Sequence, residues 1–328
     1  MGDPHLDRPS RLHAIVSAPS RVVRAFAPGG IGNIGPGIDI LGCAVTGPGD
    51  AVRAESAAFR GVQIADPGHP DLSRDAERHA AGIAALEVLR RTQSPSGMTL
   101  WMEKGLPLAG GQGGSAASAV AGAVAANALL GNPLNRNELL AAALVAEERL
   151  AGRHIDNLAP ALFGGILLIR SIAPLCFHSL PVPPSLRITL VHPAMRLPTS
   201  ESRAVLPASL DRGTALAQAG AVAAMVAAFC TGNLGLLRDA VDDRIAEPAR
   251  APLLPGFTEA KAAALNAGAL GCSISGGGPS AFALSDNDVV AQRIGEAMVA
   301  AYARAGLSAS ARVATIDCVG ARVEDLTP

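Results

Sequence analysis

Aromatic residues are scarce in this chain: seven phenylalanines, one tryptophan and one tyrosine make up 3% of its 328 residues. Hydrophobic residues nevertheless reach 49% and charged residues only 17%, so alanine, valine, leucine and isoleucine must supply most of the core. This composition excludes a disordered chain and indicates a compact globular protein. Its length allows about two domains.

An excess of charge of one sign is also lacking, since the formal net charge is −1. Lysine is nearly absent, because only Lys104 and Lys261 occur among the 27 basic residues. Without a basic block interleaved with aromatics, the sequence predicts no nucleic-acid partner. The apolar stretch AGAVAAMVAAFC (219–230) is shorter than the ~18–20 residues of a membrane span, which predicts no membrane partner.

Paired cysteines are lacking as well. The five cysteines are scattered and contain no CxxC pair, so we expect neither a zinc site nor a disulfide framework, and we predict a cytoplasmic protein. Residues 1–20 carry charges throughout and lack the apolar core of a signal peptide, so we expect a flexible N-terminal arm.

A proline-rich joint, PVPPSL at 181–186, divides the chain near its middle. We predict one α+β domain at 21–180 and a second at 187–328. Apolar residues three and four positions apart predict helices, and Asn135 is a suitable cap for one of them. The helices expected on this basis include 115–130, 136–151, 214–231, 233–249 and 257–268.

Glycine, in contrast, is abundant in three segments: GGIGNIGPGID (29–39), PLAGGQGGSA (107–116) and SISGGGPS (273–280). Glycine is used where the backbone needs positive φ or approaches another group closely. The second segment precedes a helix, whose first N–H groups and dipole favour an anion such as phosphate. A loop that only turns tightly is the alternative for any one segment. Three such segments spread over both halves indicate a shared anionic ligand between the domains.

A polar cluster stands out within EERLAGRHIDNLAPALFGG (147–165). Glu147 falls on a predicted helix, and His154, Asp156 and Asn157 fall in the loop that follows it. The flanking residues are apolar, so these side chains are candidates for chemistry. The sequence contains no GxxxxGK[ST] motif. It also has no GxGxxG motif in the strand–turn–helix setting that a dinucleotide site would need.

These segments resemble, in their order, the small-molecule kinases named for galactokinase, homoserine kinase, mevalonate kinase and phosphomevalonate kinase (GHMP kinases). PLAGGQGGSA matches the family's nucleotide motif P-x-x-x-G-L-G-S-S-A, and SGGGP (275–279) matches S-G-x-G-P. NIGPGID (33–39) and HIDNLAP (154–160) match two segments of the homoserine kinases. The resemblance spans about residues 20–320. It implies a two-domain α+β architecture: a first domain like domain 2 of ribosomal protein S5 and a ferredoxin-like second domain.

For the nucleotide, the resemblance implies that N–H groups of the loop wrap the phosphates of ATP. Ser115 matches the family serine that ligates Mg²⁺, and Glu147 matches the partner carboxylate, with Glu148 as the alternative. Such oxygen ligands, completed by phosphate oxygens and water, suit Mg²⁺. The residues expected to bind ATP are His79, Pro107, Gly110, Gly111, Gln112, Gly113, Gly114, Ser115, Ala116 and Gly277.

For the substrate, the resemblance implies ATP-dependent phosphorylation of the side-chain hydroxyl of L-homoserine, a step towards threonine. Homoserine is a zwitterion, so its site needs a carboxylate for the ammonium group and arginines for the carboxylate. Asn157 is expected to orient the hydroxyl, with Asp156 as a supporting residue or weak base, and His154 is interpreted as a hydrogen-bonded structural histidine. The residues expected to bind the substrate are Asn33, Asp39, Asn157, Arg203 and Arg250.

Three positions depart from the family pattern. Gln112 stands where leucine is usual, Gly114 replaces the first of two serines, and His79 stands where many relatives carry asparagine. Two alternatives therefore stay open: a GHMP kinase acting on a different small alcohol, and a catalytically degenerate relative that senses a ligand. The presence of Ser115 and Glu147 favours an enzyme. A homodimer is expected only from the resemblance.

Overall fold

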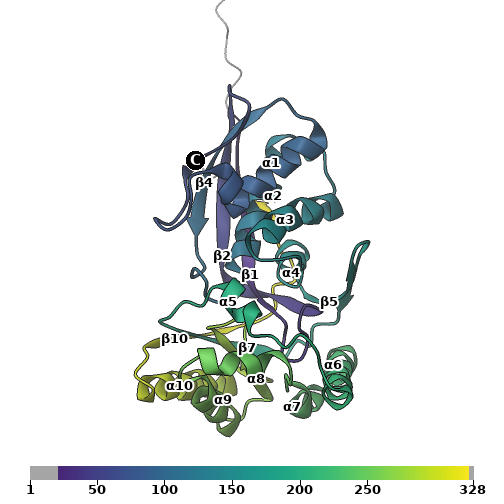
Figure 1. The fold of residues 1–328 in the computed structure, drawn as a ribbon, viewed down its shortest axis with the longest axis vertical. Coiled ribbons are helices and arrows are strands. Elements are labelled where there is room, and N and C mark those ends of the chain that lie inside the picture. The colour runs from purple at the N-terminus through teal and green to yellow at the C-terminus, as the bar shows by residue number, and fades with distance from the viewer. Residues whose placement is uncertain (1–20, 325–328) are drawn as a thin grey trace, which may run out of the picture.

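The computed structural model describes residues 21–324, and the predicted N-terminal arm lies outside these residues. The described chain forms two parts, each with its own β-sheet and helices packed against it (Figure 1). This arrangement confirms the predicted α+β class.

The first sheet has seven strands. Their order is β11-β1-β2-β4-β3, with β5 beside β2 and β6 beside β5. Because β11 pairs antiparallel with β1, the end of the described chain returns to the first sheet after passing through the second part. The strands are β1 (Val22–Gly32), β2 (Leu41–Ala57), β3 (Gly61–Asp66), β4 (Gly97–Lys104), β5 (Ile166–Ile172), β6 (Leu175–Leu180) and β11 (Arg322–Glu324).

Helix α2 (Gly114–Leu129) lies at the centre of the first part, where every residue from Ala116 to Leu129 is buried. Its small side chains let neighbouring helices approach closely: a Cβ on Gly122 would lie 2.5 Å from the carbonyl oxygen of Ala81. The predicted cap at Asn135 is confirmed, since its side chain accepts from the N–H of Glu138 at 3.1 Å. The other helices of this part are η1 (Ala76–Arg78), α1 (Ala80–Thr92), α3 (Arg136–Leu150) and α4 (Leu158–Phe163).

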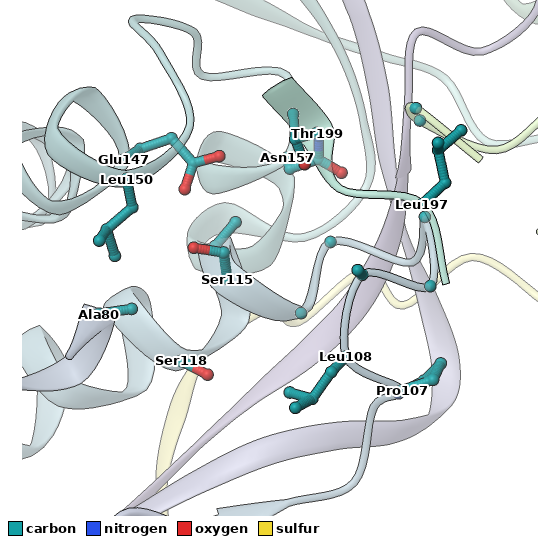
Figure 2. Close-up of a pocket in the computed structure, with 18 of the residues that line it drawn as sticks. Ala80, Pro107, Leu108, Ser115, Ser118, Glu147, Leu150, Asn157, Leu197 and Thr199 are labelled. Carbon is teal, nitrogen blue, oxygen red and sulfur yellow. The ribbon is translucent and has the colours of Figure 1, made fainter. Parts of the chain in front are cut away.

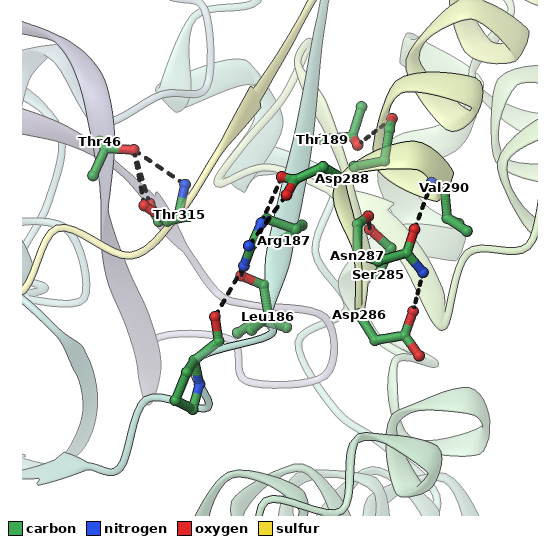
Figure 3. Close-up of polar contacts among 12 residues, drawn as sticks. Thr46, Leu186, Arg187, Thr189, Ser285, Asp286, Asn287, Asp288, Val290 and Thr315 are labelled. Carbon is green, nitrogen blue, oxygen red and sulfur yellow. Dashed lines mark hydrogen bonds and ion pairs between the residues drawn. The ribbon is translucent and has the colours of Figure 1, made fainter.

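The second sheet has four strands in the order β10-β7-β9-β8. Helices α9 (Phe257–Asn266) and α10 (Asp288–Arg304) pack against it, and Figure 3 shows how the start of α10 is fixed. Asn287 caps α10 by accepting from the N–H of Val290 at 2.9 Å, and Arg187 pairs with Asp288 at 2.6 Å. The strands are β7 (Arg187–Pro193), β8 (Gly271–Ile274), β9 (Ala281–Ser285) and β10 (Ala309–Ala314).

The predicted helix over 233–249 is wrong, because this segment is broken into shorter pieces. The break lies at Asp243, whose carboxylate accepts from the N–H groups of Ala246 and Glu247 at 2.9 and 3.0 Å and so starts a new helix. A short acidic side chain that caps a helix start competes with continued helix. The remaining helices are α5 (Thr199–Ala204), α6 (Arg212–Thr231), η2 (Leu234–Leu236), α7 (Leu237–Ala240), α8 (Ala246–Arg250) and η3 (Ala251–Leu253).

Helix α6 is longer than the apolar stretch singled out in the sequence. Within residues 21–324 it is the one helix long and apolar enough to cross a membrane, by length and composition only, and 22% of its most apolar window is buried inside the molecule. Here α6 contributes Met225 and Phe229 to a hydrophobic cluster that also contains Ile31 of the first sheet and Phe282 of the second. This shared cluster packs the two parts against each other.

Hydrogen bonds from main-chain N–H groups also join the two parts. Figure 3 shows Thr46 of β2 beside Thr315, which follows β10. The N–H of Thr46 donates to the carbonyl of Thr315 at 2.9 Å, and the N–H of Thr315 donates to Thr46 Oγ1 at 3.1 Å. The two parts are therefore held in a fixed relation on either side of the site described next.

Candidate active site

Residues 105–113 join β4 to α2, and their backbone takes up conformations that favour glycine at Gly111 and Gly113. Gly111 has φ +73° and Gly113 has φ +70°. A Cβ on Gly111 would lie 2.5 Å from the carbonyl oxygen of Ser275, so no side chain fits there. Gly113 is the N-cap residue of α2, and no side chain of the described residues caps that end of the helix. The first turn of α2 therefore offers N–H groups in the arrangement that binds anions.

The three glycine-rich segments meet at this loop. Ser275 Oγ of the third segment donates to the carbonyl of Gly111 at 2.7 Å. The N–H of Gly276 donates to the carbonyl of Gly32, in the first segment, at 3.1 Å. Both parts of the molecule thus enclose the loop at the place where the sequence predicts one shared ligand.

A cavity of about 330 Å³ lies against the loop and the start of α2, a volume in the range of small-molecule sites. In Figure 2, Ala80 and Leu108 lie on one side of Ser115, whereas Asn157 and Thr199 lie on the other. Of the predicted site residues, the cavity is lined by Asn33, His79, Pro107, Gly110, Gly111, Gly113, Gly114, Ser115, Ala116, Glu147, Asp156, Asn157, Arg203, Arg250 and Gly277.

Gln112, expected to bind ATP, does not line the cavity. Its side chain points towards the second part, where Nε2 donates to Ser280 Oγ at 3.2 Å and Oε1 accepts from Arg312 at 3.4 Å. Its carbonyl also accepts from the N–H of Gly30 at 3.1 Å. The polar side chain that replaces the usual leucine therefore has polar partners, and it links the loop to the second part. The side-chain direction depends on backbone dihedrals that the sequence does not specify.

Glu147 and Glu148 are distinguished by burial. Glu147 is 4% exposed and lines the cavity, whereas Glu148 faces outwards and lies 3.4 Å from Arg153. Burial raises the pKa of Glu147, while the positive charge of His154 and the hydroxyl of Ser115 act in the opposite direction. Figure 2 shows the Glu147 carboxylate and Ser115 directed into the same space. Glu147 Oε2 is buried and has no hydrogen-bond partner among the described residues.

His154 lies between two carboxylates. Its Nε2 is 3.6 Å from Glu147 Oε1, and its Nδ1 is 3.3 Å from Asp156 Oδ1. Burial alone would lower the pKa of His154, but the Asp156 and Glu147 carboxylates outweigh burial and raise it. Asn157 follows, with Nδ2 3.5 Å from Asp156 Oδ2 and with Oδ1 buried and without a partner in the described chain. The polar cluster read from the sequence is thus assembled at one wall of the cavity.

Asp39, expected to bind the substrate, also does not line the cavity. Instead, it forms a two-pronged ion pair with Arg203, which does: Oδ1 lies 2.6 Å and Oδ2 3.3 Å from the two terminal guanidinium nitrogens. Asn33 holds Asp39 in place, because Asn33 Oδ1 accepts from the N–H of Asp39 at 2.9 Å. Two residues expected to hold opposite ends of a substrate therefore hold each other.

Arg250 is a buried cation whose partners are uncharged. It is 2% exposed, and it donates to the carbonyls of Ser202 and Gly276 at 3.1 and 3.0 Å. Within residues 21–324 no carboxylate lies within ion-pair distance of Arg250. Burial, followed by the positive charge of Arg203, lowers its pKa. A buried guanidinium without a paired carboxylate is costly.

Lys104 lines the cavity although the sequence analysis gave it no role. Its ammonium pairs with Asp50 and donates to Ser118 Oγ at 3.1 Å and to the carbonyl of Gly114 at 3.3 Å. Ser118 in turn donates to Asp50 at 2.6 Å. This network fastens β4 to the first turn of α2. Its only signal in the sequence was the rarity of lysine in a chain rich in arginine. The other lining residues that were missed are Leu72, Arg78, Ala80, Leu108, Ala109, Ser118, Leu150, Leu197, Thr199, Gly276 and Gly278.

Two family models match parts of this chain. The GHMP kinases N terminal domain matches residues 79–165, and the GHMP kinases C terminal domain matches residues 225–304. A homoserine kinase of Chlorobaculum tepidum is 40% identical over 324 residues, which are 94% of this chain and 99% of that protein. A homoserine kinase of Arabidopsis thaliana is 43% identical over 311 residues, 92% of this chain and 84% of that protein.

A solved structure is similar over nearly the whole chain. The crystal structure of homoserine kinase from Cytophaga hutchinsonii superposes with a TM-score of 0.89 at 40% sequence identity, covering 92% of this chain and 97% of that one. This chain is therefore similar to that protein in both fold and amino-acid sequence.

Proposed function

We propose a reaction for this chain from one premise: the chain belongs to the GHMP kinases and, within them, to the homoserine kinases. The reaction is transfer of the terminal phosphate of ATP to the side-chain hydroxyl of L-homoserine, giving O-phospho-L-homoserine and ADP in threonine biosynthesis. The observation that carries this proposal is the buried cation of Arg250 beside the pair of Arg203 and Asp39.

This charge pattern suits an amino acid. An α-carboxylate placed between Arg203 and Arg250 gives Arg250 the anion that it lacks. The α-ammonium group then takes Asp39, which loses part of its pairing with Arg203 when the carboxylate arrives. Each charge of the zwitterion meets an opposite charge, so the exchange costs little. A hydroxy acid lacks the ammonium group, so the negative charge of Asp39 would lose part of its pairing with Arg203 without gaining another cation.

The loop and the start of α2 suit the phosphates of ATP. Gly111 and Gly113 shape the loop so that main-chain N–H groups of α2 are directed to the cavity. Mg²⁺ fits the same place, because Glu147 offers a buried oxygen without a partner and Ser115 offers a hydroxyl beside it. When bound, the metal neutralises phosphate charge. We propose Ser115 and Glu147 as the residues that hold it.

Asn157 and Asp156 are proposed to position the hydroxyl that is phosphorylated. The free Oδ1 of Asn157 accepts the hydroxyl proton as a hydrogen bond, and Asp156 fixes the Asn157 amide through its Nδ2. Phosphoryl transfer proceeds through a loose transition state, so alignment and charge neutralisation supply most of the acceleration. Asp156, held by His154, is the carboxylate placed to receive the proton as the new bond forms.

The test is ADP release from Mg-ATP by the purified protein with L-homoserine, shikimate, mevalonate and pantoate offered separately. We expect turnover with L-homoserine and at most background with the others. Turnover with another alcohol instead of L-homoserine would identify that alcohol as the substrate of this chain. Binding of ATP or of the amino acid without any turnover would indicate the degenerate sensor instead.

The remaining expectations from the sequence belong to the same proposal: a cytoplasmic enzyme without nucleic-acid or membrane partners that forms a homodimer. Light scattering of the purified protein tests the dimer, and a mass of one chain would exclude it.

A further inference from the structure

Gln218 is a buried amide in the otherwise apolar middle of α6. It is 6% exposed, and from Ala215 to Cys230 it is the one residue whose side chain carries an amide or a charge. A buried amide lowers stability unless its N–H groups and its carbonyl are hydrogen-bonded. Gln218 does not line the cavity of the candidate active site, so any effect on the site must pass through the groups to which it is bonded.

The amide group of Gln218 is hydrogen-bonded to two different segments of the chain. Its Nε2 donates to the carbonyl of Pro36 at 2.7 Å and to Asp243 Oδ1 at 3.0 Å. Its Oε1 accepts from the N–H of Arg244 at 2.8 Å. Both N–H groups of the amide are therefore used, one on each segment, and the carbonyl oxygen is engaged as well. One side chain thus joins the loop of residues 33–39 to the main chain that begins α8.

The first of these segments carries Asp39. Pro36 lies three residues before Asp39, and Gly35 turns the chain there with φ +57°. A Cβ on Gly35 would lie 3.1 Å from a methyl carbon of Val241, so the loop packs closely against the second part of the molecule. The bond from Gln218 to the carbonyl of Pro36 therefore holds the loop main chain close to the carboxylate that it presents.

The second segment starts the helix that carries Arg250. Asp243 is 5% exposed, and its carboxylate caps α8 by accepting from the N–H groups of Ala246 and Glu247. Arg250 is the last residue of this five-residue helix. So short a helix has little stability of its own, and its direction depends on the groups that anchor it. Gln218 donates to the capping carboxylate and so restrains the start of the helix.

We infer that Gln218 is a positioning residue for the substrate, because its amide sets where Asp39 lies relative to Arg250. The inference rests on the proposed function, in which these two side chains hold the ammonium and carboxylate groups of one amino acid. Both groups are attached to the same carbon atom, so a displacement of one binding residue relative to the other weakens the pair of contacts. No partner of the amide belongs to the nucleotide loop of residues 107–113, so ATP binding does not depend on it.

The experiment compares Gln218→Met with the wild type in steady-state kinetics. Methionine keeps the length of the side chain and removes the N–H donors and the carbonyl. We expect kcat/KM for L-homoserine at saturating Mg-ATP to fall by about tenfold to a hundredfold, and KM for ATP to change by less than about twofold.

Two unreactive analogues separate positioning from general damage. L-2-Aminobutyrate and L-2-hydroxybutyrate both lack the terminal hydroxyl and differ only in the ammonium group. The inhibition constant of the amino acid against L-homoserine should rise by about tenfold in Gln218→Met. That of the hydroxy acid should rise by less than about threefold, because it has no ammonium contact to lose. A loss of stability alone would not change the two constants differently.

Two control variants and a measurement without turnover complete the test. Gln292→Met makes the same replacement at an exposed glutamine of α10 and should leave every constant unchanged. Ile294→Ala removes volume from a core cluster of the second part that excludes the loop, so it should lower stability but keep kcat/KM for L-homoserine. Amide hydrogen exchange of the free protein should become faster across residues 33–41 in Gln218→Met and stay as in the wild type in Ile294→Ala.

Three results would count against the inference, and they are distinguishable. A kcat/KM for L-homoserine within about twofold of the wild type in Gln218→Met would overturn it. Equal rises in KM for ATP and in both inhibition constants would also overturn it, because Gln218 would then serve stability alone. Absence of homoserine turnover in the wild type would refute the proposed function and the inference with it, whereas wild-type turnover that Gln218→Met leaves unchanged would refute the inference alone.

Discussion

Arg250→Met is the substitution that separates substrate binding from stability most sharply. The side chain is 2% exposed, and its charge is compensated by two carbonyl groups rather than by an acid. Methionine keeps the length and apolar stem but removes the charge. In the proposed complex, Arg250 holds the substrate carboxylate. We therefore predict that the substitution lowers kcat/KM for homoserine much more than it lowers the free energy of unfolding.

The magnitude for stability follows from opposing contributions. Loss of two hydrogen bonds from a charged donor costs about 1.5–3 kcal/mol each, but removing a buried cation relieves a desolvation penalty of several kcal/mol. The Gly276 carbonyl also keeps the bond from Asn33 Nδ2 at 3.1 Å. We expect the free energy of unfolding to change by no more than about 1–2 kcal/mol.

The magnitude for catalysis is larger. Truncating one partner of a buried charge pair costs about 2–5 kcal/mol, which lowers kcat/KM for homoserine by between about 30-fold and a few thousand-fold. The assay combines urea unfolding with steady-state kinetics in which homoserine is varied at saturating Mg-ATP. KM for ATP should change little. Arg244→Met, at an exposed arginine paired with Asp242 at 2.9 Å, is the matched control.

Either of two results would refute this reasoning. One is a kcat/KM for homoserine within threefold or so of the wild type, since it would remove Arg250 from the substrate site. The other is a loss of about 3 kcal/mol or more in stability together with equal losses for ATP and homoserine, which would make Arg250 a structural residue.

Three other substitutions test the remaining parts of the site. Asp39→Asn should reduce turnover of L-homoserine by about tenfold or more and spare a hydroxy-acid analogue, and equal losses would exclude the ammonium contact. Ser115→Ala should raise the Mg²⁺ concentration needed for half-maximal activity without changing KM for homoserine, and an unchanged metal titration would remove Ser115 from the metal site. Gln112→Ala should lower the free energy of unfolding, measured by urea denaturation, by about 1–3 kcal/mol because it removes the hydrogen bonds to Ser280 and Arg312, and full stability would show that this link contributes nothing.

Local signals explain why part of this account could be predicted from the sequence. The loop and α2 are encoded by neighbouring glycines and alanines, and the start of α3 is encoded by Asn135 and Glu138 three residues apart. The family motifs assign Ser115, Glu147 and Asn157 to one candidate site, and in the folded chain all three line one cavity.

The rest depends on contacts between segments far apart in the chain. Gln112 meets Ser280 and Arg312, and Asp39 meets Arg203, only after both parts of the molecule have folded. The return of β11 to the first sheet is likewise a pairing across most of the chain. The break in the predicted helix over 233–249 was missed for a different reason, because Asp243 is compatible with a helix until its capping bonds are considered.

The most direct test of the central claim is a crystal structure with a non-hydrolysable ATP analogue, Mg²⁺ and L-homoserine. The account predicts the phosphates at the start of α2, the homoserine carboxylate on Arg203 and Arg250, its ammonium group on Asp39 and its hydroxyl beside Asn157. A homoserine carboxylate bound away from both arginines, or phosphates bound outside the loop of residues 107–115, would contradict it.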